Sequence, residues 1–300
     1  MVMVVAKQQY ETNTSGSDQA KLCHLLESER RRIFAYETPE FAELFNALVL
    51  KRGMPEIITV DVFDTLLLRG DESEIKRFWD IACAQTQYLK NNGNLQFEPE
   101  DLLAARLSAT KVSYRASPIK QGCREGSISD IYRIMARTGL RLEDKLEQEL
   151  LAIELQHEQT ALRLNTGLLQ NLQLLNAKGA KLVLVSDMYL HSEHIQILLD
   201  EKYPRWRDDF SKLISSADTT VSKASGKLYD SLCEEHGWRY DTWVHMGDAG
   251  KGDVQRPNEK GIHAIHLPIS RATTESRKRC EIQTRDLLRV KGLDPRMFNA

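Results

Sequence analysis

The residues of this sequence that could do chemistry begin with Asp61 and Thr65. A short apolar run, Ile57 to Val60, leads into Asp61, and Thr65 follows four residues later. In an open α/β sheet, ligands collect just beyond the carboxyl ends of the strands. An aspartate at such a strand end, with a threonine four residues on, has the layout of a carboxylate nucleophile. Since a strand-end aspartate alone is often only a turn former or a helix cap, the pattern needs support from the rest of the chain.

Three further groups of polar residues follow predicted strands, at Ser186 and Asp187, at Lys223, and at Asp248 and Asp253. Each group has an ordinary structural explanation as a helix cap, a surface lysine or a turn former. All of them together, in this order on the strands of one parallel sheet, are much less expected by chance. Because the carboxyl ends of parallel strands meet at one edge of the sheet, the order predicts a common site there.

These groups resemble the motifs of the haloacid dehalogenase-like superfamily, most of whose members are phosphatases and phosphotransferases. The first motif of that family, Asp-x-Asp-x-Thr, corresponds to Asp61 and Thr65. The second motif, a strand-end serine or threonine, corresponds to Ser186. The resemblance covers residues 56–70 and 165–268, with a helical cap inserted between the first two motifs.

The last two motifs of the family are also present. The third is a lysine six residues before an aromatic residue in a helix, which fits Lys223 and Tyr229, with Lys227 as the weaker candidate. The fourth is Gly-Asp with a second aspartate five residues later, which fits Asp248 and Asp253. The full set is specific for the superfamily and leaves the substrate open.

The resemblance implies a magnesium-dependent hydrolase, foremost a phosphatase that acts on a small phosphate monoester through an aspartyl-phosphate on Asp61. A magnesium ion would offset the repulsion between this carboxylate and a phosphate dianion, and few carboxylates with a main-chain carbonyl suit that ion. The implied site comprises Asp61 and Lys223 as catalytic residues, Thr65, Ser186 and Arg69 as phosphate-binding residues, Asp61, the Phe63 main-chain carbonyl and Asp248 as metal ligands, and Asp253 and Asp187 as supporting residues.

Phe63 is the departure from the family pattern. Phosphatases of the family have an aspartate at this position as general acid and base, a function worth roughly 10²–10⁴-fold in rate, and phenylalanine cannot transfer a proton. Three further functions therefore stay open: a non-catalytic module that binds a phosphorylated ligand or a partner protein, a haloacid dehalogenase, and a phosphonatase. Dehalogenation needs no metal, so the retained Asp248 and Asp253 speak against it. A phosphonatase needs a desolvated cap lysine, for which Lys76, Lys111 and Lys120 are candidates.

The pattern along the chain predicts an α/β fold, a doubly wound parallel sheet with an all-helical cap. Short apolar strands alternate with helices after the first 160 or so residues, as in a parallel sheet covered on both faces. The expected strands span 56–60, 181–185, 213–215, 242–246 and 264–267, and the last cap helix is expected from 142 to 164. We expect a helical N-terminal extension at 1–50, a catalytic core at 51–71 and 161–270, a helical cap at 72–160 and a helical tail at 271–300.

Composition narrows the classes of protein. A composition of 41% apolar and 28% charged residues predicts a soluble globular protein. No apolar run approaches the roughly 18 residues of a membrane span. The formal net charge of −2 gives no general attraction to nucleic acid, and the basic tail reads as a solvated face. Five scattered cysteines without a CxxC pair predict reduced thiols and a cytoplasmic location. The expected partner is a small phosphorylated metabolite, with neither a membrane nor a nucleic acid, and the sequence does not indicate an oligomeric state.

Overall fold

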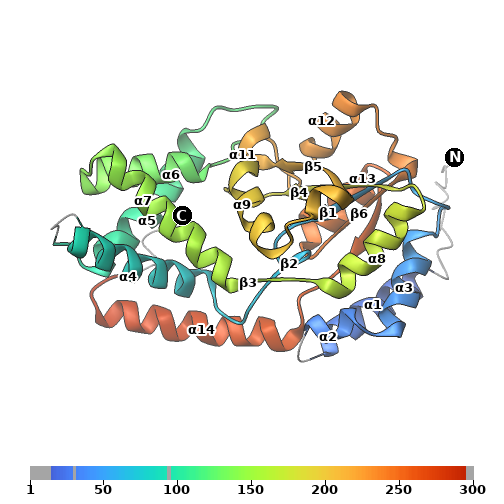
Figure 1. Ribbon diagram of the computed structural model, residues 1–300, viewed down its shortest axis with the longest axis horizontal. Helices are drawn as coiled ribbons and strands as arrows, with labels where there is room; N and C mark the ends of the chain where they lie inside the picture. The colour runs from blue at the N-terminus through green and yellow to red at the C-terminus, as the bar shows by residue number, and fades with distance from the viewer. Residues whose placement is uncertain (1–14, 30–31, 93–95, 295–300) are drawn as a thin grey trace, which may run out of the picture.

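The computed structural model describes residues 15–29, 32–92 and 96–294. A five-stranded parallel sheet in the order β5-β4-β1-β6-β7 lies at its centre (Figure 1). Its strands are β1 (Ile57–Asp61), β4 (Lys181–Ser186), β5 (Phe210–Ser215), β6 (Trp243–Gly247) and β7 (His263–His266). Each expected strand is present, although β5 begins three residues earlier than predicted. Because β1 lies between β4 and β6, the winding of the chain reverses at β1, and a ligand site is expected at its carboxyl end.

Both faces of the sheet are buried, as the short continuous apolar strands predict. All five residues of β1 are buried. Alternate residues point to opposite faces: Ile58 and Val60 join the larger hydrophobic core, whereas Ile57 joins a second core with Val183 and Val185 of β4.

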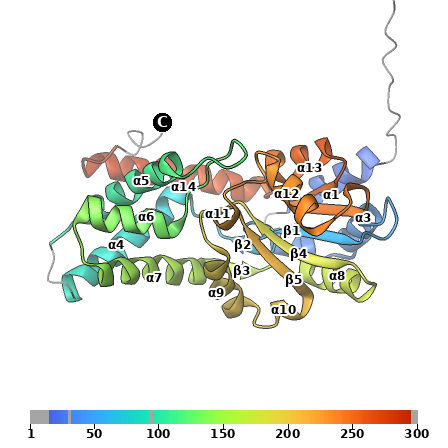
Figure 2. The ribbon, with the colours of Figure 1, turned by 90° about the horizontal axis from the view of Figure 1, so that it is seen from above.

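The helices that follow the strands cover the two faces of the sheet (Figure 2). Helices α8 (Thr166–Ala177), α9 (Ser192–Lys202) and α10 (Trp206–Asp209) lie on one side, and α12 (Lys227–His236) and α13 (Arg256–Glu259) on the other. The short elements between them are α11 (Ser216–Thr219), a 3₁₀ turn (Tyr240–Thr242) and a π-helical turn (Gly250–Gln255).

Three N-terminal helices pack on the α/β core: α1 (Ser15–Ser28), α2 (Arg32–Tyr36) and α3 (Pro39–Val49). Helix α3 starts where Thr38 accepts a hydrogen bond from the Phe41 main-chain N–H, with proline in the first turn. Phe41 and Phe45 are fully buried in the same core as β1. The N-terminal helices therefore share the hydrophobic core of the sheet.

The segment between the first two sheet strands is helical. It consists of α4 (Glu74–Asn92), α5 (Pro99–Ala116), α6 (Ile128–Ile134), a π-helical turn (Met135–Leu140) and α7 (Asp144–Ala161). Glu98 and Asp101 form a capping box at the start of α5, and the Ser127 hydroxyl caps α6 at the Asp130 N–H. Figure 1 shows these helices as a lobe beside the sheet. We refer to α4 through α7 as the helical insert.

The prediction was wrong at the end of the insert. The helix expected to run to residue 164 ends at Ala161, and strand β3 (Leu162–Leu164) follows, which pairs antiparallel with β2 (Leu67–Arg69). This two-stranded ribbon, which the sequence did not reveal, carries the chain into the insert and back out of it. The pairing of Leu67 with Leu164 spans the entire insert, so local propensity cannot show it.

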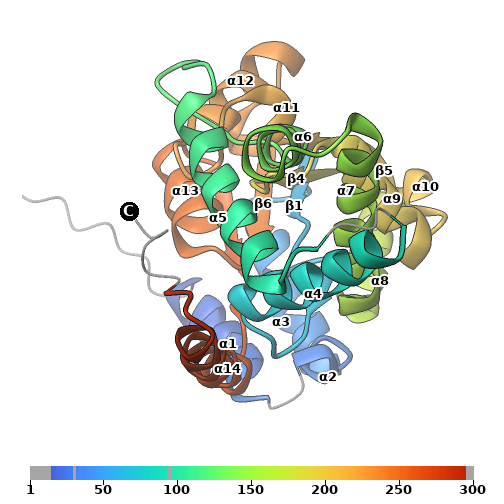
Figure 3. The ribbon, with the colours of Figure 1, turned by 90° about the vertical axis from the view of Figure 1, so that its left-hand side faces the viewer.

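The last described helix, α14 (Arg271–Val290), runs beneath the helical insert and the sheet (Figure 1), and Figure 3 shows it nearly end-on beside α1. It begins at Ser270, whose hydroxyl accepts a hydrogen bond from the Thr273 N–H. It contacts α1 beside the sheet and α4 of the insert. Within the described part of the chain, no helix is long and apolar enough to cross a membrane.

Candidate active site

The carboxyl end of β1 brings Asp61, Lys223 and Asp253 into direct contact. The Lys223 ammonium lies 2.5 Å from Asp61 Oδ1 and 2.7 Å from Asp253 Oδ1, and all three side chains are buried. Burial opposes the charge of Lys223, but Asp253 and Asp61 overcome it and raise the pKa of this lysine well above its usual value. The structure therefore places Lys223 against the predicted nucleophile, whereas Lys227 is half exposed and faces Asp230.

Asp61 and Asp253 differ in charge state although they share this lysine. Burial raises the pKa of Asp61 to about 7, with Lys223 lowering it and Asp253 raising it. Burial acts in the same direction on Asp253, but Lys223 and a hydrogen bond from His245 hold its pKa below the usual value. Burial and Asp253 thus oppose the ionisation of Asp61, whereas Lys223 and His245 favour the carboxylate form of Asp253.

Asp253 is fixed by a chain of buried hydrogen bonds from β1 and β6. Trp243 Nε1 donates to Thr59 Oγ1 over 2.7 Å, and Thr59 Oγ1 lies 2.7 Å from His245 Nδ1. His245 Nε2 lies 3.0 Å from Asp253 Oδ1, and the Ala249 N–H donates to Oδ2 over 3.0 Å. The chain is satisfied when Thr59 donates to Nδ1 and the neutral imidazole donates to Asp253, in line with burial lowering the pKa of His245.

The donor set fits a hard divalent cation. One carboxylate oxygen from each of Asp61, Asp248 and Asp253 lies within 4.8 Å of the others. Oxygen ligands of this kind suit Mg²⁺. Both Asp253 oxygens already accept hydrogen bonds and Oδ1 also faces Lys223, which disfavours Asp253 as a direct ligand.

Ser186 is the last residue of β4, Asp187 follows it, and Asp187 binds the loop that carries Lys223. Its two carboxylate oxygens accept hydrogen bonds from the main-chain N–H groups of Lys223 and Ala224, over 2.7 and 2.9 Å. Ser186 Oγ is buried and accepts a hydrogen bond from the Met188 N–H over 3.3 Å. Thr65 is also buried, and its hydroxyl lowers the pKa of Asp61. Among the described residues, this hydroxyl completes no hydrogen bond of standard geometry.

Phe63 and Arg69 form a stacked pair beside the site. The Arg69 guanidinium lies 4.4 Å from the centre of the Phe63 ring, at a distance typical of a cation–π contact. Arg69 also donates to Glu158 of α7 over 2.9 and 3.2 Å. The predicted phosphate-binding arginine thus has an internal counter-ion on the insert, which the sequence did not reveal.

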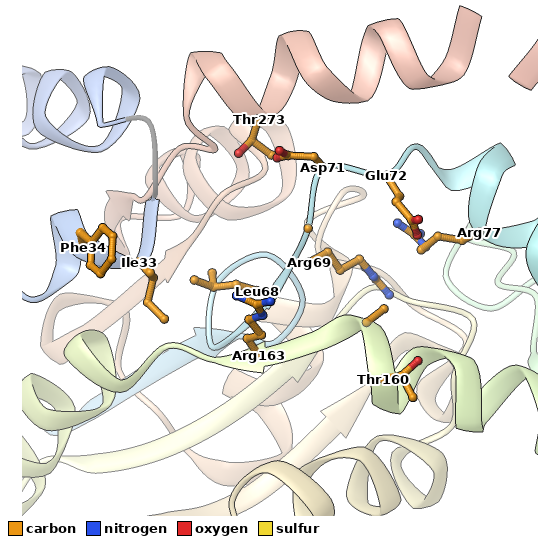
Figure 4. A pocket seen from close by; sticks show the side chains of 12 residues that line it. Ile33, Phe34, Leu68, Arg69, Asp71, Glu72, Arg77, Thr160, Arg163 and Thr273 are labelled. Carbon is orange, nitrogen blue, oxygen red and sulfur yellow. The ribbon is translucent and has the colours of Figure 1, made fainter. Parts of the chain in front are cut away.

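A pocket in the described part of the chain lies at the ribbon rather than at Asp61. It has a volume of about 700 Å³, and Figure 4 shows Arg69 and Leu68 of β2, Arg163 of β3 and Arg77 of α4 around it. As far as the described residues go, the lining contains Arg69 but neither Asp61 nor Lys223. The carboxylate site and this ribbon pocket are therefore separate places on the molecule, joined through Arg69.

The strand order, with β1 between β4 and β6, and the meeting of all four motif positions at one edge of the sheet agree with the family resemblance. The path of the chain is similar to that of solved haloacid dehalogenase-like proteins. Among solved structures, it is similar to a haloacid dehalogenase-like hydrolase from Xanthomonas campestris, with 15% identity, 77% of this chain and 94% of that chain covered, and a TM-score of 0.46.

Two further similar structures differ in their described chemistry. One is a haloacid dehalogenase-family enzyme from Bacteroides thetaiotaomicron in complex with magnesium and inorganic phosphate, with 14% identity, 69% of this chain and 91% of that chain covered, and a TM-score of 0.46. The second is a 2-haloacid dehalogenase from Pseudomonas syringae pv. Tomato, with 15% identity, coverage of 70% and 84%, and the same TM-score. Similarity at this level concerns the path of the chain and assigns no substrate. No protein-family profile matches the sequence, and no curated protein matches it either.

Proposed function

We propose that this haloacid dehalogenase-like protein is a magnesium-dependent phosphatase of small phosphate monoesters. The observation that carries the proposal is the buried contact of Lys223 with Asp61 and Asp253, with Asp248 within 4.8 Å of both carboxylates. This arrangement has the parts of a carboxylate nucleophile, a fixed cation next to it and oxygen ligands for a metal. The proposed substrate is a small phosphorylated metabolite, the proposed location is cytoplasmic, and the helical insert is proposed to act as a cap over the site.

In the proposed reaction, a carboxylate oxygen of Asp61 attacks phosphorus, and the bond from phosphorus to the ester oxygen breaks. Lys223 neutralises the charge of Asp61 and of the phosphoryl group, and the hydroxyls of Thr65 and Ser186 hold phosphoryl oxygens. Water then attacks the aspartyl-phosphate, which releases phosphate and restores Asp61. Magnesium, held by Asp61, Asp248 and the Phe63 carbonyl, would supply charge neutralisation for the substrate phosphate.

The nearest carboxyl group to Phe63 in the sequence does not replace the missing acid. Both carboxylate oxygens of Asp64 accept hydrogen bonds from Arg277, at 2.9 and 2.8 Å, so this group is already engaged in an ion pair. Leaving alcohols would therefore depart without protonation from the first motif. Turnover is expected to be fastest on esters with good leaving groups.

A second candidate function is a non-catalytic module that binds a phosphorylated ligand, and Phe63 is the observation that favours it. A dehalogenase and a phosphonatase have less support. Asp248 and Asp253 keep a cation site that dehalogenation does not need. Two of the lysines that a phosphonatase would require are unsuitable, since Lys120 is exposed and Lys76 pairs with Asp80, which raises the pKa of Lys76 against the effect of its partial burial.

A substrate screen separates these functions. Phosphate esters, phosphonates and 2-haloacids are offered to the purified chain with Mg²⁺ or with EDTA, and Asp61→Asn is run in parallel. The proposal predicts release of phosphate from esters with Mg²⁺ only, no turnover by Asp61→Asn, and a phosphorylated Asp61 detectable by mass spectrometry after rapid quenching. Halide release in EDTA would establish a dehalogenase instead. Thermal stabilisation by phosphate esters without turnover would establish a binding module.

A further inference from the structure

Arg277 of the C-terminal helix α14 reaches the loop that follows the proposed nucleophile. Its Nη1 and Nη2 donate to the two carboxylate oxygens of Asp64 over 2.9 and 2.8 Å. The same guanidinium donates to the main-chain oxygens of Gly70 and Arg69 over 3.0 and 3.2 Å. A planar guanidinium with two parallel bonds to a carboxylate fixes orientation as well as distance. One side chain of α14 therefore binds both the loop between β1 and the ribbon and the far end of β2.

Asp64 stands in an unusual backbone conformation. Its φ is +57°, in the left-handed region that residues other than glycine seldom adopt, although aspartate tolerates it better than most. The Asp64 N–H donates to the Leu67 oxygen over 2.8 Å, and Asp64 Oδ1 accepts from the Arg69 N–H over 3.3 Å. The conformation of Asp64 is thus held by its carboxylate, and that carboxylate is held by Arg277.

The peptide that joins Phe63 to Asp64 carries the Phe63 carbonyl. The proposed function assigns this carbonyl to magnesium, together with Asp61 and Asp248. A change in the backbone of Asp64 turns this peptide, so whatever fixes Asp64 also fixes the direction of the carbonyl. Groups that orient a metal ligand from outside the first layer of ligands commonly change metal affinity by roughly 10–100-fold when they are removed.

The far half of α14 is anchored on the insert. Lys291 pairs with Glu100 of α5 over 2.8 Å, and its ammonium lies 5.5 Å from the ring centre of Trp79. The Ser73 N–H, at the start of the insert, lies 3.5 Å from Cys280 Sγ. Helix α14 is therefore braced against the insert while Arg277 holds the loop of the core, which keeps the guanidinium in place.

We propose that Arg277 is a positioning residue of the metal site, acting through Asp64 on the Phe63 carbonyl, and that α14 is consequently part of the active-site structure. The inference rests on the proposed function because it takes magnesium as the ion. The inference gives Arg277, one of the arginines of the basic tail, a role that is unrelated to nucleic-acid binding. Its neighbour Arg279 is a matched control, since it is exposed and donates to Ser276 of its own helix.

The test is calorimetric titration of the full chain with Mg²⁺ in the absence of substrate. The variants are Arg277→Gln, Asp64→Asn, the double variant and Arg279→Gln. Arg277→Gln and Asp64→Asn are each expected to weaken Mg²⁺ binding about tenfold, and the double variant should lose little more than the more affected single variant. Arg279→Gln should bind Mg²⁺ like the parent.

Parent-like Mg²⁺ affinity of folded Arg277→Gln would overturn the inference, as would fully additive losses in the double variant. A lower melting temperature with unchanged affinity would mean that Arg277 only stabilises the fold. If Arg277→Gln does not fold, Asp64→Asn decides, because asparagine also tolerates the left-handed conformation. A parent chain that binds no Mg²⁺ would instead overturn the proposed function itself, and the inference with it.

Discussion

Phe63 determines how the proposed chemistry differs between substrates. Its ring lies under the Arg69 guanidinium in a largely buried place, so the surroundings are built for an aromatic side chain rather than for an acid. Phe63→Asp would introduce a carboxyl group at the position where the family has its general acid. Arg69 would lie close to that carboxyl and favour its ionised form, which limits the gain.

We therefore expect Phe63→Asp to raise kcat on alkyl phosphates towards the lower end of the roughly 10²–10⁴-fold range of general acid catalysis. Aryl phosphates with good leaving groups should gain less in the bond-breaking step. The measurement is steady-state kinetics on both ester classes with excess Mg²⁺. Phe63→Asn is the control, because it is similar in shape to the aspartate and has no acidic proton. If the folded Phe63→Asp variant has an equal or lower kcat on both ester classes, the result would favour the non-catalytic binding module over the phosphatase.

The raised pKa of Asp61 makes the stability of the metal-free protein depend on pH. Burial raises this pKa to about 7 in the folded chain, whereas the unfolded chain ionises near the ordinary value of 3.8. The unfolded state then binds fewer protons between these two values, so stability falls as pH rises through the interval and levels off above the folded pKa. Asp61→Asn cannot ionise. In EDTA, its melting temperature should rise relative to the parent between about pH 5 and about pH 8.

Scanning calorimetry across this pH range checks the sign. Asp71→Asn, at an exposed position of the loop after β2, is the control and should follow the parent. Added Mg²⁺ should raise the melting temperature of the parent at the alkaline end and change that of Asp61→Asn much less. A pH-independent gap between Asp61→Asn and the parent would contradict the raised pKa of Asp61.

At the scale of elements, α7 connects the insert to the core through two glutamates one turn apart. Both carboxylate oxygens of Glu154 accept hydrogen bonds from Arg106 over 2.9 Å. Glu154 also accepts a hydrogen bond over 2.9 Å from the hydroxyl of Tyr189, which lies in the loop after β4. Glu158 forms a salt bridge with Arg69 of β2. The Arg106 and Glu154 side chains are almost fully buried. Such a pair costs much more to break than to replace with apolar groups.

Glu154→Gln is accordingly expected to lower the free energy of unfolding by about 3–5 kcal/mol, because it leaves the Arg106 charge buried without its partner. Replacing the pair in Glu154→Leu/Arg106→Met should cost less than Glu154→Gln alone. Tyr189→Phe, which removes one hydroxyl, should cost about 1 kcal/mol. Urea unfolding followed by circular dichroism gives all three values. A double variant less stable than Glu154→Gln would show that packing rather than charge dominates at this place.

The sequence predicted the sheet strands and the residues at their ends because both depend on local patterns. Runs such as Leu182 to Val185 show burial directly, and the polar residue after each run marks the ligand edge. The β2–β3 ribbon was missed, since Leu162–Leu164 continues a helical run and forms a strand only through its partner across the insert. For the same reason, the sequence could not show that Arg69 meets Glu158 or that Arg277 meets Asp64: the pairs are formed by residues far apart in the chain.

For the whole molecule, the contacts that α7 and α14 make with both the core and the insert predict that these two parts unfold together. Helix α14 contacts both lobes, α7 holds Tyr189 and Arg69, and one hydrophobic core includes Trp79 of the insert as well as Val60 of the sheet. A ligand that binds only the folded core, such as Mg²⁺, would then stabilise the insert too, because the two parts share one transition.

Trp79 provides the measurement, since it is the only tryptophan of the insert and Trp206, Trp238 and Trp243 lie outside it. Thermal unfolding of the parent and of Trp79→Phe is followed by fluorescence, and by circular dichroism as the global probe. Subtraction of the two fluorescence curves isolates the signal of the insert. We expect this signal, the remaining tryptophans and the circular dichroism to give the same midpoint, and all three to shift upward together when Mg²⁺ is added. An insert signal that melts first and does not respond to Mg²⁺ would show an independently unfolding lobe. The ties through α7 and α14 would then be too weak to couple the insert to the metal site.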